Sequence, residues 1–159
     1  MQSRRGCSGA WLMGLAVVAD QATKWAVRRW PGRRELIAGV LCCRPVRNSG
    51  MAFSLFAGRG WVLTALTAAI VAGLTAWLLM KPDEPRLTRA GFWLIAGGGL
   101  GNLIDRLAFG AVTDFLELEF TRFAIFNVAD VCVCTGAALA ALGMLMAEGM
   151  KGRRKDGAV

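Results

Sequence analysis

The sequence contains no histidine, although the chain is 159 residues long. This absence removes the usual imidazole general base and most kinds of zinc site. The five cysteines include no CxxC pair, and their odd number does not indicate a disulfide framework. We expect neither a metal nor another cofactor. We interpret the cysteines mainly as small apolar side chains, at Cys7, Cys42, Cys43, Cys132 and Cys134.

Charged residues are missing from several long stretches of the chain. Hydrophobic residues make up 55% of the sequence and its mean hydropathy is +0.47, which is too apolar for an ordinary soluble domain. The net charge of +8 does not indicate nucleic-acid binding, because the lysines and arginines lie in short clusters between apolar runs. Such clusters are typical of membrane flanks and of contacts with anionic headgroups.

Four apolar segments predict four transmembrane helices, over residues 8–27, 60–80, 88–107 and 129–149. The predicted fold class is therefore an all-α polytopic membrane protein with a single membrane-embedded domain. The second segment is the clearest, because its 21 residues carry no charge. In the third segment, Gly97 and Gly101 form a GxxxG pair that lets a neighbouring helix approach closely.

The first predicted helix contains two charges. Its uncharged part, residues 6–19, is too short to cross a hydrocarbon core of about 30 Å, so the helix must continue through Asp20 and Lys24. These residues lie four apart on one helical face and can neutralise each other. The alternative is a cleaved signal peptide, with Arg4 and Arg5 before the apolar run and a cleavage point near Ala19. The apolar pattern continues past that point, which favours the transmembrane helix.

The connecting segments differ from the helices in composition. Residues 28–59 contain turn residues, arginines and short apolar patches, which predicts a small extracytoplasmic β element between the first two helices. Residues 108–126 are expected to form a loop, and residues 150–159 a disordered, basic cytoplasmic tail. Lysine and arginine are almost equally numerous on the two sides of the predicted membrane. The basic tail, with Arg4 and Arg5 beside the first helix, favours cytoplasmic termini.

Polar residues enter the apolar context repeatedly, always on the same predicted side of the membrane. Ionisable groups within a membrane are costly and are by default hypotheses of a functional site. Their common side predicts one shared site near the outer surface. The residues of this set are Asp20, Lys24, Asn48, Asn102, Asp105, Arg106, Asp114, Asn127 and Asp130.

Local partners separate two kinds of carboxylate within this set. Asp20 has Lys24 one helical turn away, and Asp105 adjoins Arg106, so we interpret these two acids as structural. Asp114 and Asp130 each have no cation within four residues and lie among apolar side chains. Both acids should therefore resist ionisation. If they approach within about 3 Å, they can share one proton, activate a water molecule and protonate a leaving group.

Each polar residue also has a purely structural interpretation. Asp130 can cap the last helix together with Asn127. Asp114 can be a solvated loop residue. The other candidates have equally ordinary roles, which are a turn for Asn48, an interhelical hydrogen bond for Asn102 and a headgroup anchor for Arg106.

Four motifs in order resemble the bacterial lipoprotein signal peptidase (signal peptidase II) family, aspartic proteases of the cytoplasmic membrane. They are DQATK at 20–24, NSGMAFSLF at 48–56, GGGLGNLIDRLAFGAVTDF at 97–115 and FNVAD at 126–130. The resemblance implies that Asp114 and Asp130 form a catalytic dyad. It also implies supporting roles for Asp20, Lys24, Asn48, Asn102, Asp105, Arg106 and Asn127.

The resemblance implies a reaction as well. The expected activity is removal of prolipoprotein signal peptides by cleavage immediately before a diacylglyceryl-modified cysteine. The expected partners are lipid-modified prolipoproteins and membrane phospholipids, with no nucleic acid. The expected location is the bacterial inner membrane, with the active site near its extracytoplasmic surface. Activity should then be insensitive to serine, cysteine and metal reagents.

The main alternative is a non-enzymatic four-helix membrane protein, either a transporter subunit or a lipid-binding scaffold. A transporter predicts polar residues through the bilayer midplane, where this sequence offers little beyond a few threonines. A scaffold would keep its function after either aspartate is made neutral. Neutralising Asp114 or Asp130 therefore distinguishes the enzyme from the scaffold.

Overall fold

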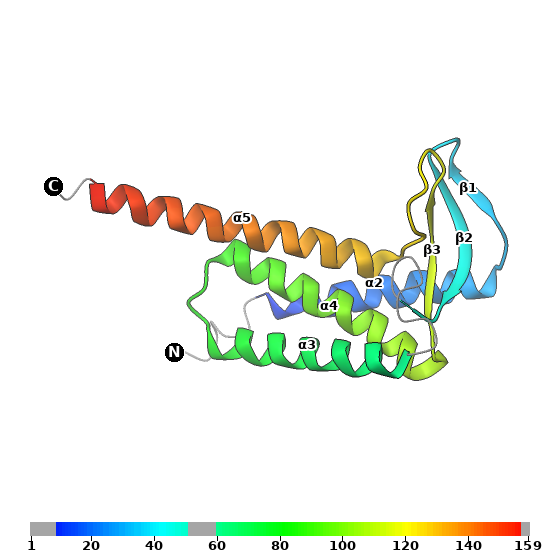
Figure 1. Ribbon diagram of the computed structural model, residues 1–159, viewed down its shortest axis with the longest axis horizontal. Helices are drawn as coiled ribbons and strands as arrows, with labels where there is room; N and C mark the ends of the chain where they lie inside the picture. Colours follow the sequence, from blue (N-terminus) through cyan, green and yellow to red (C-terminus); the bar gives the residue numbers. More distant parts are fainter. Residues whose placement is uncertain (1–8, 51–59, 157–159) are drawn as a thin grey trace.

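The computed structural model describes residues 9–50 and 60–156. In this part of the chain, long helices lie side by side and a small antiparallel sheet lies at one end of them (Figure 1). The helices are α2 (Ala10–Arg29), α3 (Gly60–Met80), α4 (Arg86–Phe109) and α5 (Val128–Asp156). The strands are β1 (Arg34–Ile37), β2 (Leu41–Asn48) and β3 (Val112–Leu118).

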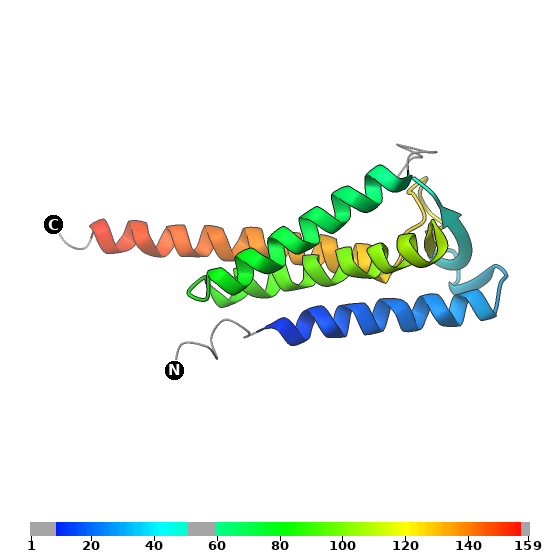
Figure 2. The same ribbon diagram turned by 90° about the horizontal axis from the view of Figure 1, so that it is seen from below.

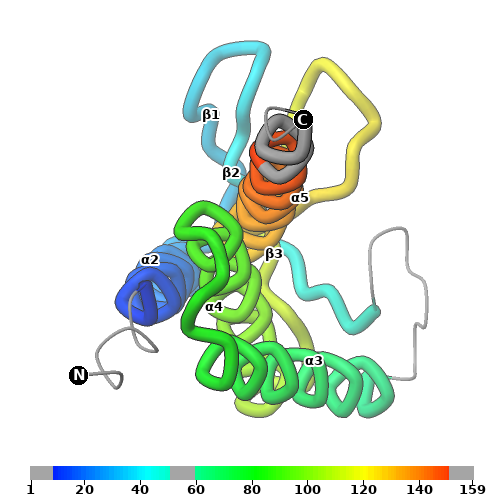
Figure 3. The backbone as a smooth tube through the Cα atoms, turned by 90° about the vertical axis from the view of Figure 1, so that its left-hand side faces the viewer, coloured from blue at the N-terminus to red at the C-terminus, as the bar shows by residue number. Residues whose placement is uncertain are grey.

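Helix α4 is the centre of the bundle. It packs against α2, α3 and α5, and a view along the helices shows it between these three (Figure 3). The GxxxG pair explains one of these contacts. A methyl group on Gly97 would lie 2.8 Å from the Ala16 side chain, and one on Gly101 would lie 2.6 Å from Asp20 Oδ2. The predicted close approach is thus confirmed, and the approaching helix is α2.

Two helices are long and apolar enough to span a membrane by composition, α3 and the Val128–Met150 part of α5. Helices α2 and α4 run beside α5, and α3 is inclined to them (Figure 2). Helices α2 and α4 carry more charges than the two apolar spans. Several of those charges point into the bundle, since Asp20, Lys24 and Asp105 are fully buried. The four-span count therefore stays a prediction. Helix α2 continues unbroken past Ala19 to Arg29, as the transmembrane interpretation of this segment requires.

The β element predicted between the first two helices is confirmed by β1 and β2. The prediction of a loop over residues 108–126 was wrong, because residues Val112–Leu118 form β3 and pair antiparallel with β2. The register places Asp114 opposite Val46 and Val112 opposite Asn48. Strand β3 was missed because its partner lies more than sixty positions earlier, and pairing over that distance leaves little local signal.

The end of the chain differs from the prediction as well. Helix α5 continues to Asp156, so the prediction of a disordered tail from residue 150 was wrong up to that residue. Lysine and arginine are good helix formers and do not stop a helix by themselves. Several predictions concern residues outside the described ranges, namely those on Arg4, Arg5, Cys7, positions 51–56 of the second motif and positions 157–159.

Candidate active site

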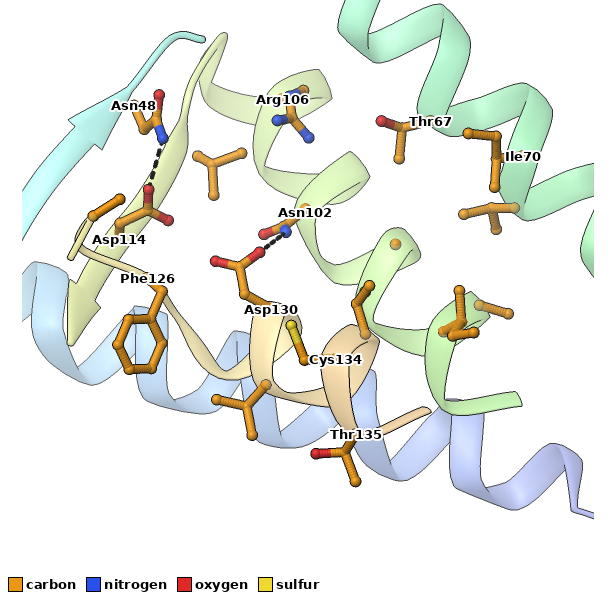
Figure 4. A pocket seen from close by; sticks show the side chains of 18 of the residues that line it. Asn48, Thr67, Ile70, Asn102, Arg106, Asp114, Phe126, Asp130, Cys134 and Thr135 are labelled. Atoms are coloured by element: carbon orange, nitrogen blue, oxygen red, sulfur yellow. Dashed lines mark hydrogen bonds between the residues drawn. The ribbon is translucent and has the colours of Figure 1, made fainter. Parts of the chain in front are cut away.

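The predicted polar residues meet where the sheet adjoins α2, α4 and α5. Hydrogen bonds or ion pairs connect all of them except Arg106, which lines the same cavity as Asp114 and Asp130. Figure 4 shows the two aspartates directed toward this cavity from different elements, β3 and the first turn of α5. The polar residues that the sequence analysis grouped therefore form one spatial cluster.

Asp114 is almost completely buried, with 3% of its surface exposed, so the solvated-loop interpretation is wrong. Its Oδ2 accepts a hydrogen bond from Asn48 Nδ2 at 2.9 Å, and its Oδ1 accepts one from Asn127 Nδ2 at 2.7 Å. Burial raises the pKa of Asp114, and the neighbouring Asp130 charge raises it further. The two amide hydrogen bonds oppose this rise in pKa because they stabilise the carboxylate.

Asp130 belongs to the site and also caps α5. Its backbone N–H donates to Asn127 Oδ1 at 3.0 Å, and its Oδ2 accepts from the Asn127 backbone N–H at 3.1 Å. This reciprocal pair is the predicted capping arrangement. The other carboxylate oxygen, Oδ1, accepts from Asn102 Nδ2 at 2.9 Å. Because a carboxylate has two oxygens, the capping role and a role in the cavity do not exclude each other.

Asn102 links the two aspartates to a buried lysine. Lys24 Nζ donates to Asn102 Oδ1 at 2.8 Å, and Asn127 Nδ2 donates to the same oxygen at 3.1 Å. An amide whose oxygen receives two donors must turn its NH₂ group the other way, toward Asp130. The predicted interhelical hydrogen bond of Asn102 is therefore confirmed, and it also orients an active-site candidate.

The supporting acids have different partners from those that local spacing indicates. Asp20 pairs with Lys24 at 2.8 Å as predicted, and Asp20 Oδ1 also accepts the Ala129 backbone N–H at 2.9 Å. Asp105, however, does not pair with its neighbour Arg106. Its Oδ1 lies 2.6 Å from Arg28 Nη2. Consecutive helical residues point in different directions, so the adjacency in sequence was misleading.

Three residues of the network were missed by the sequence analysis. Arg28 binds Asp105, the Thr113 backbone N–H donates to Asp105 Oδ2 at 2.8 Å, and Gln21 Nε2 donates to Asp105 Oδ1 at 3.3 Å. A signal for Arg28 was available, because positions 20, 24 and 28 repeat every four residues along one helical face. No comparable signal marked Thr113, since it depends on the strand that was not predicted.

A cavity of about 770 Å³ opens beside the two aspartates. Its polar end holds Asn48, Asn102 and Arg106, and Figure 4 shows the Arg106 side chain close to the two acids. Among the described residues, Arg106 makes no ion pair. The rest of the lining is largely apolar and comes from α3, α4, α5 and the segment before α5, including Ile70, Val71, Leu74, Ile95, Phe126 and Val131.

The described residues contain no group of three or more histidine, cysteine or acidic side chains placed to hold a metal ion. The site instead contains the buried carboxyl group of Asp114 and the carboxyl group of Asp130, which line one cavity together with Arg106. Such a pair can hold a single proton, activate water and stabilise a developing negative charge. The close approach of the two carboxyls to about 3 Å stays a prediction.

Sequence comparisons place this chain among relatives of known type. The profile of a family described as signal peptidase (SPase) II matches residues 12–146. The lipoprotein signal peptidase of Gloeobacter violaceus is 40% identical over 142 residues, which cover 87% of this chain and 82% of that protein. The lipoprotein signal peptidase of Thermosynechococcus vestitus is 38% identical over 132 residues, which cover 79% of this chain and 84% of that protein.

Solved structures share the fold. One, described as a bacterial membrane enzyme determined by the in meso method at 2.3 Å resolution, superposes with a TM-score of 0.79 and is 26% identical. The match covers 87% of this chain and 88% of that one. Another with the same description, at 1.9 Å resolution, gives a TM-score of 0.78 and 26% identity, over 87% of this chain and 92% of that one. The arrangement of bundle and sheet is thus common to these proteins.

Proposed function

Because the chain belongs to the signal peptidase II family, we propose that it is a bacterial membrane endopeptidase that removes signal peptides from prolipoproteins. Cleavage falls immediately before the diacylglyceryl-modified cysteine. The observation that carries the aspartic mechanism is the pair Asp114 and Asp130, which line one cavity beside Arg106. No histidine is present in the chain to serve as the base.

Charge balance supports a single shared proton. In the supporting network, Asp20 and Asp105 carry two negative charges and Lys24 and Arg28 two positive charges, so these four residues sum to zero. Arg106 supplies one further positive charge at the cavity. The two aspartates balance it when one is ionised and the other protonated. Two ionised aspartates would leave a net charge of −1 in a site that is mostly buried, which is costly.

The proposed reaction uses these groups as follows. The ionised aspartate takes a proton from a water molecule while the water oxygen attacks the scissile carbonyl carbon. The protonated aspartate donates a hydrogen bond to the carbonyl oxygen, and the Arg106 guanidinium stabilises the negative charge that develops there. The aspartate that took the water proton then transfers it to the departing amine, which breaks the C–N bond and leaves the pair with its original single proton. Asn48, Asn102 and Asn127 hold the two carboxyl groups in place.

The shape of the cavity supports a lipid-modified substrate. Its polar end lies beside the sheet, and its apolar walls come from helices α3, α4 and α5. A substrate cysteine that carries two acyl chains stays at a bilayer surface, so its scissile bond can reach the aspartates while the chains remain in an apolar environment. We place four spans in the membrane, the site near the extracytoplasmic surface and both termini in the cytoplasm. Helix α2 begins and α5 ends at the end of the bundle away from the sheet (Figure 1).

The test is replacement of each aspartate by asparagine, with release of signal peptide from a lipidated precursor measured in membranes. Asp114→Asn and Asp130→Asn should each lower the rate by about a thousandfold or more, because neither variant can both activate water and donate a proton. Asp83→Asn is the matched control, since Asp83 is exposed at the opposite end of the bundle. Release at the wild-type rate by both active-site variants would contradict the mechanism.

The same measurement addresses the non-enzymatic alternatives. A lipid-binding scaffold would still bind lipid and would release no peptide in the wild-type protein. A transporter requires polar groups along the bundle, whereas the described network is concentrated at the end beside the sheet.

A further inference from the structure

Arg28 lies in the last turn of α2 and contacts two elements of the site at once. Its Nη2 lies 2.6 Å from Asp105 Oδ1 on α4, and its Nε donates to Thr113 Oγ1 on β3 at 2.9 Å. The guanidinium carbon also lies 4.2 Å from the centre of the Phe109 ring. With 28% of its side chain exposed, Arg28 is more buried than an ordinary surface arginine. It does not line the cavity.

Asp105 transmits this contact to the reacting end of β3. Its Oδ2 accepts the backbone N–H of Thr113 at 2.8 Å, so it fixes the main chain immediately before Asp114. Arg28 holds the other oxygen of Asp105 and the side chain of Thr113. The three residues therefore bind the start of β3 to the ends of α2 and α4. A change in these contacts would move Asp114 directly.

Arg28 also influences which acceptors Lys24 contacts. Lys24 Nζ lies 2.8 Å from both Asp20 Oδ2 and Asn102 Oδ1, and 3.6 Å from Asp105 Oδ2. Without Arg28, two buried carboxylates would share one ammonium group and leave a net charge of −1. Asp105 would then compete for Lys24. Movement of Lys24 toward Asp105 would take its donor away from Asn102.

The consequence for Asn102 reaches the second aspartate. Asn102 turns its NH₂ group toward Asp130 because its oxygen receives donors from both Lys24 and Asn127, so loss of the Lys24 donor would leave this orientation less firmly held. An Asn102 side chain that can flip would present an oxygen to the Asp130 carboxylate and repel it. Arg28 is thus connected to Asp114 through Thr113 and to Asp130 through Lys24 and Asn102.

We propose that Arg28 is a positioning residue for signal-peptide cleavage, which holds both aspartates in their reactive arrangement without touching the substrate. This inference rests on the proposed function of Asp114 and Asp130. It assigns a role that the motif resemblance did not indicate. Because Arg28 lies outside the cavity, its loss should impair the chemical step while substrate binding is retained.

The experiment compares Arg28→Gln, Arg28→Lys and Arg29→Gln in the full chain with a lipidated precursor. Arg28→Gln should lower kcat by about 10- to 100-fold with KM within about twofold, the range expected when reacting groups are displaced slightly. Arg28→Lys should recover part of kcat, because lysine restores the charge but not the second contact with Thr113. Arg29→Gln is the matched control, since the Arg29 guanidinium lies 4.2 Å from the centre of the Trp25 ring and is no part of this network.

A double substitution at Arg28 and Asp105 distinguishes a positioning role of Arg28 from a loss of folding. Loss of Arg28 leaves an excess negative charge on the buried carboxylates, and Asp105→Asn removes that charge. In an Asp105→Asn background, Arg28→Gln should therefore lower kcat by less than about threefold. Thermal unfolding of every variant identifies those that fail to fold. The inference is overturned if Arg28→Gln keeps kcat within twofold of wild type, if KM rises instead, or if the two substitutions act independently. Asp114→Asn in the same assay tests the proposed function separately, because it should be inactive whatever the result for Arg28.

Discussion

Asn127 Nδ2 donates a 2.7 Å hydrogen bond to Asp114 Oδ1, while the backbone N–H and side-chain oxygen of the same asparagine form the reciprocal cap with Asp130. One residue therefore holds both candidate catalytic carboxyls. Asn127 is fully buried and also donates to Asn102 Oδ1 at 3.1 Å. Asn127 therefore holds the first turn of α5 next to β3, the two elements that supply the reacting groups.

Replacements of Asn127 should separate its capping role from its bridging role. Asn127→Ala removes both, so it should lower the free energy of unfolding by about 1 kcal/mol and reduce kcat by about 10- to 100-fold. Asn127→Ser keeps an oxygen that can cap the helix but cannot reach Asp114 with an amide donor. The serine variant should therefore regain stability without regaining kcat. Thermal unfolding and peptide release measure the two effects, and recovery of both together in Asn127→Ser would argue against the bridge.

Loss of Asn48 should shift the pH dependence of the reaction upward. The Asn48 amide stabilises the ionised form of Asp114, so Asn48→Ala raises the pKa of Asp114 beyond the increase that burial already causes. Protonation of the ionised member of the pair abolishes activity on the acid side of the pH–rate profile. Loss of the proton from the protonated member abolishes it on the alkaline side, and a higher pKa of Asp114 moves the limb that Asp114 controls to higher pH. Arg44→Gln is the control, because Arg44 pairs with Glu117 on the sheet. A profile in which neither limb moves, or in which a limb moves to lower pH, would contradict the stabilisation of the Asp114 carboxylate by Asn48.

The expected insensitivity to cysteine reagents requires one exception. Cys134 is exposed and lines the cavity one helical turn from Asp130 (Figure 4). A bulky maleimide attached to it should block substrate and reduce peptide release, although the thiol takes no part in the reaction. Treated Cys134→Ser should keep its own untreated rate. Cys132→Ser should remain as sensitive as wild type, since Cys132 does not line the cavity. Equal sensitivity of both serine variants would place the reactive thiol elsewhere.

Gly101 should tolerate no side chain. A methyl group there would lie 2.6 Å from Asp20 Oδ2, which is fully buried and paired with Lys24. We expect Gly101→Ala to destabilise the protein by about 1–3 kcal/mol, the usual range for overpacking a well-packed core. Gly73→Ala, in α3, is the control because nothing lies within 4 Å of its added methyl group, so its stability should equal or slightly exceed that of wild type. Equal unfolding temperatures for the two variants would show that α2 can move away from α4.

Local features of this protein could be predicted from the sequence. The charge-free segment became α3 with its predicted bounds, Gly60–Met80, because an uninterrupted apolar run of that length has few alternatives. Asp20 and Lys24 pair as predicted, since a spacing of four places two side chains on one helical face. The cap between Asn127 and Asp130 was equally readable, because its partners lie three positions apart.

Relationships between distant segments were decided only by the tertiary structure. Pairing of β3 with β2, and of Asp105 with Arg28 in place of Arg106, depends on segments brought together from far along the chain. The orientation of Asn102 depends on Lys24, which reaches it from another helix. The sequence by itself determined which polar residues would be too costly to leave unpaired in an apolar bundle. Their partners were determined by the fold, because hydrogen bonds and ion pairs form between groups that are close in space, whatever their separation along the chain.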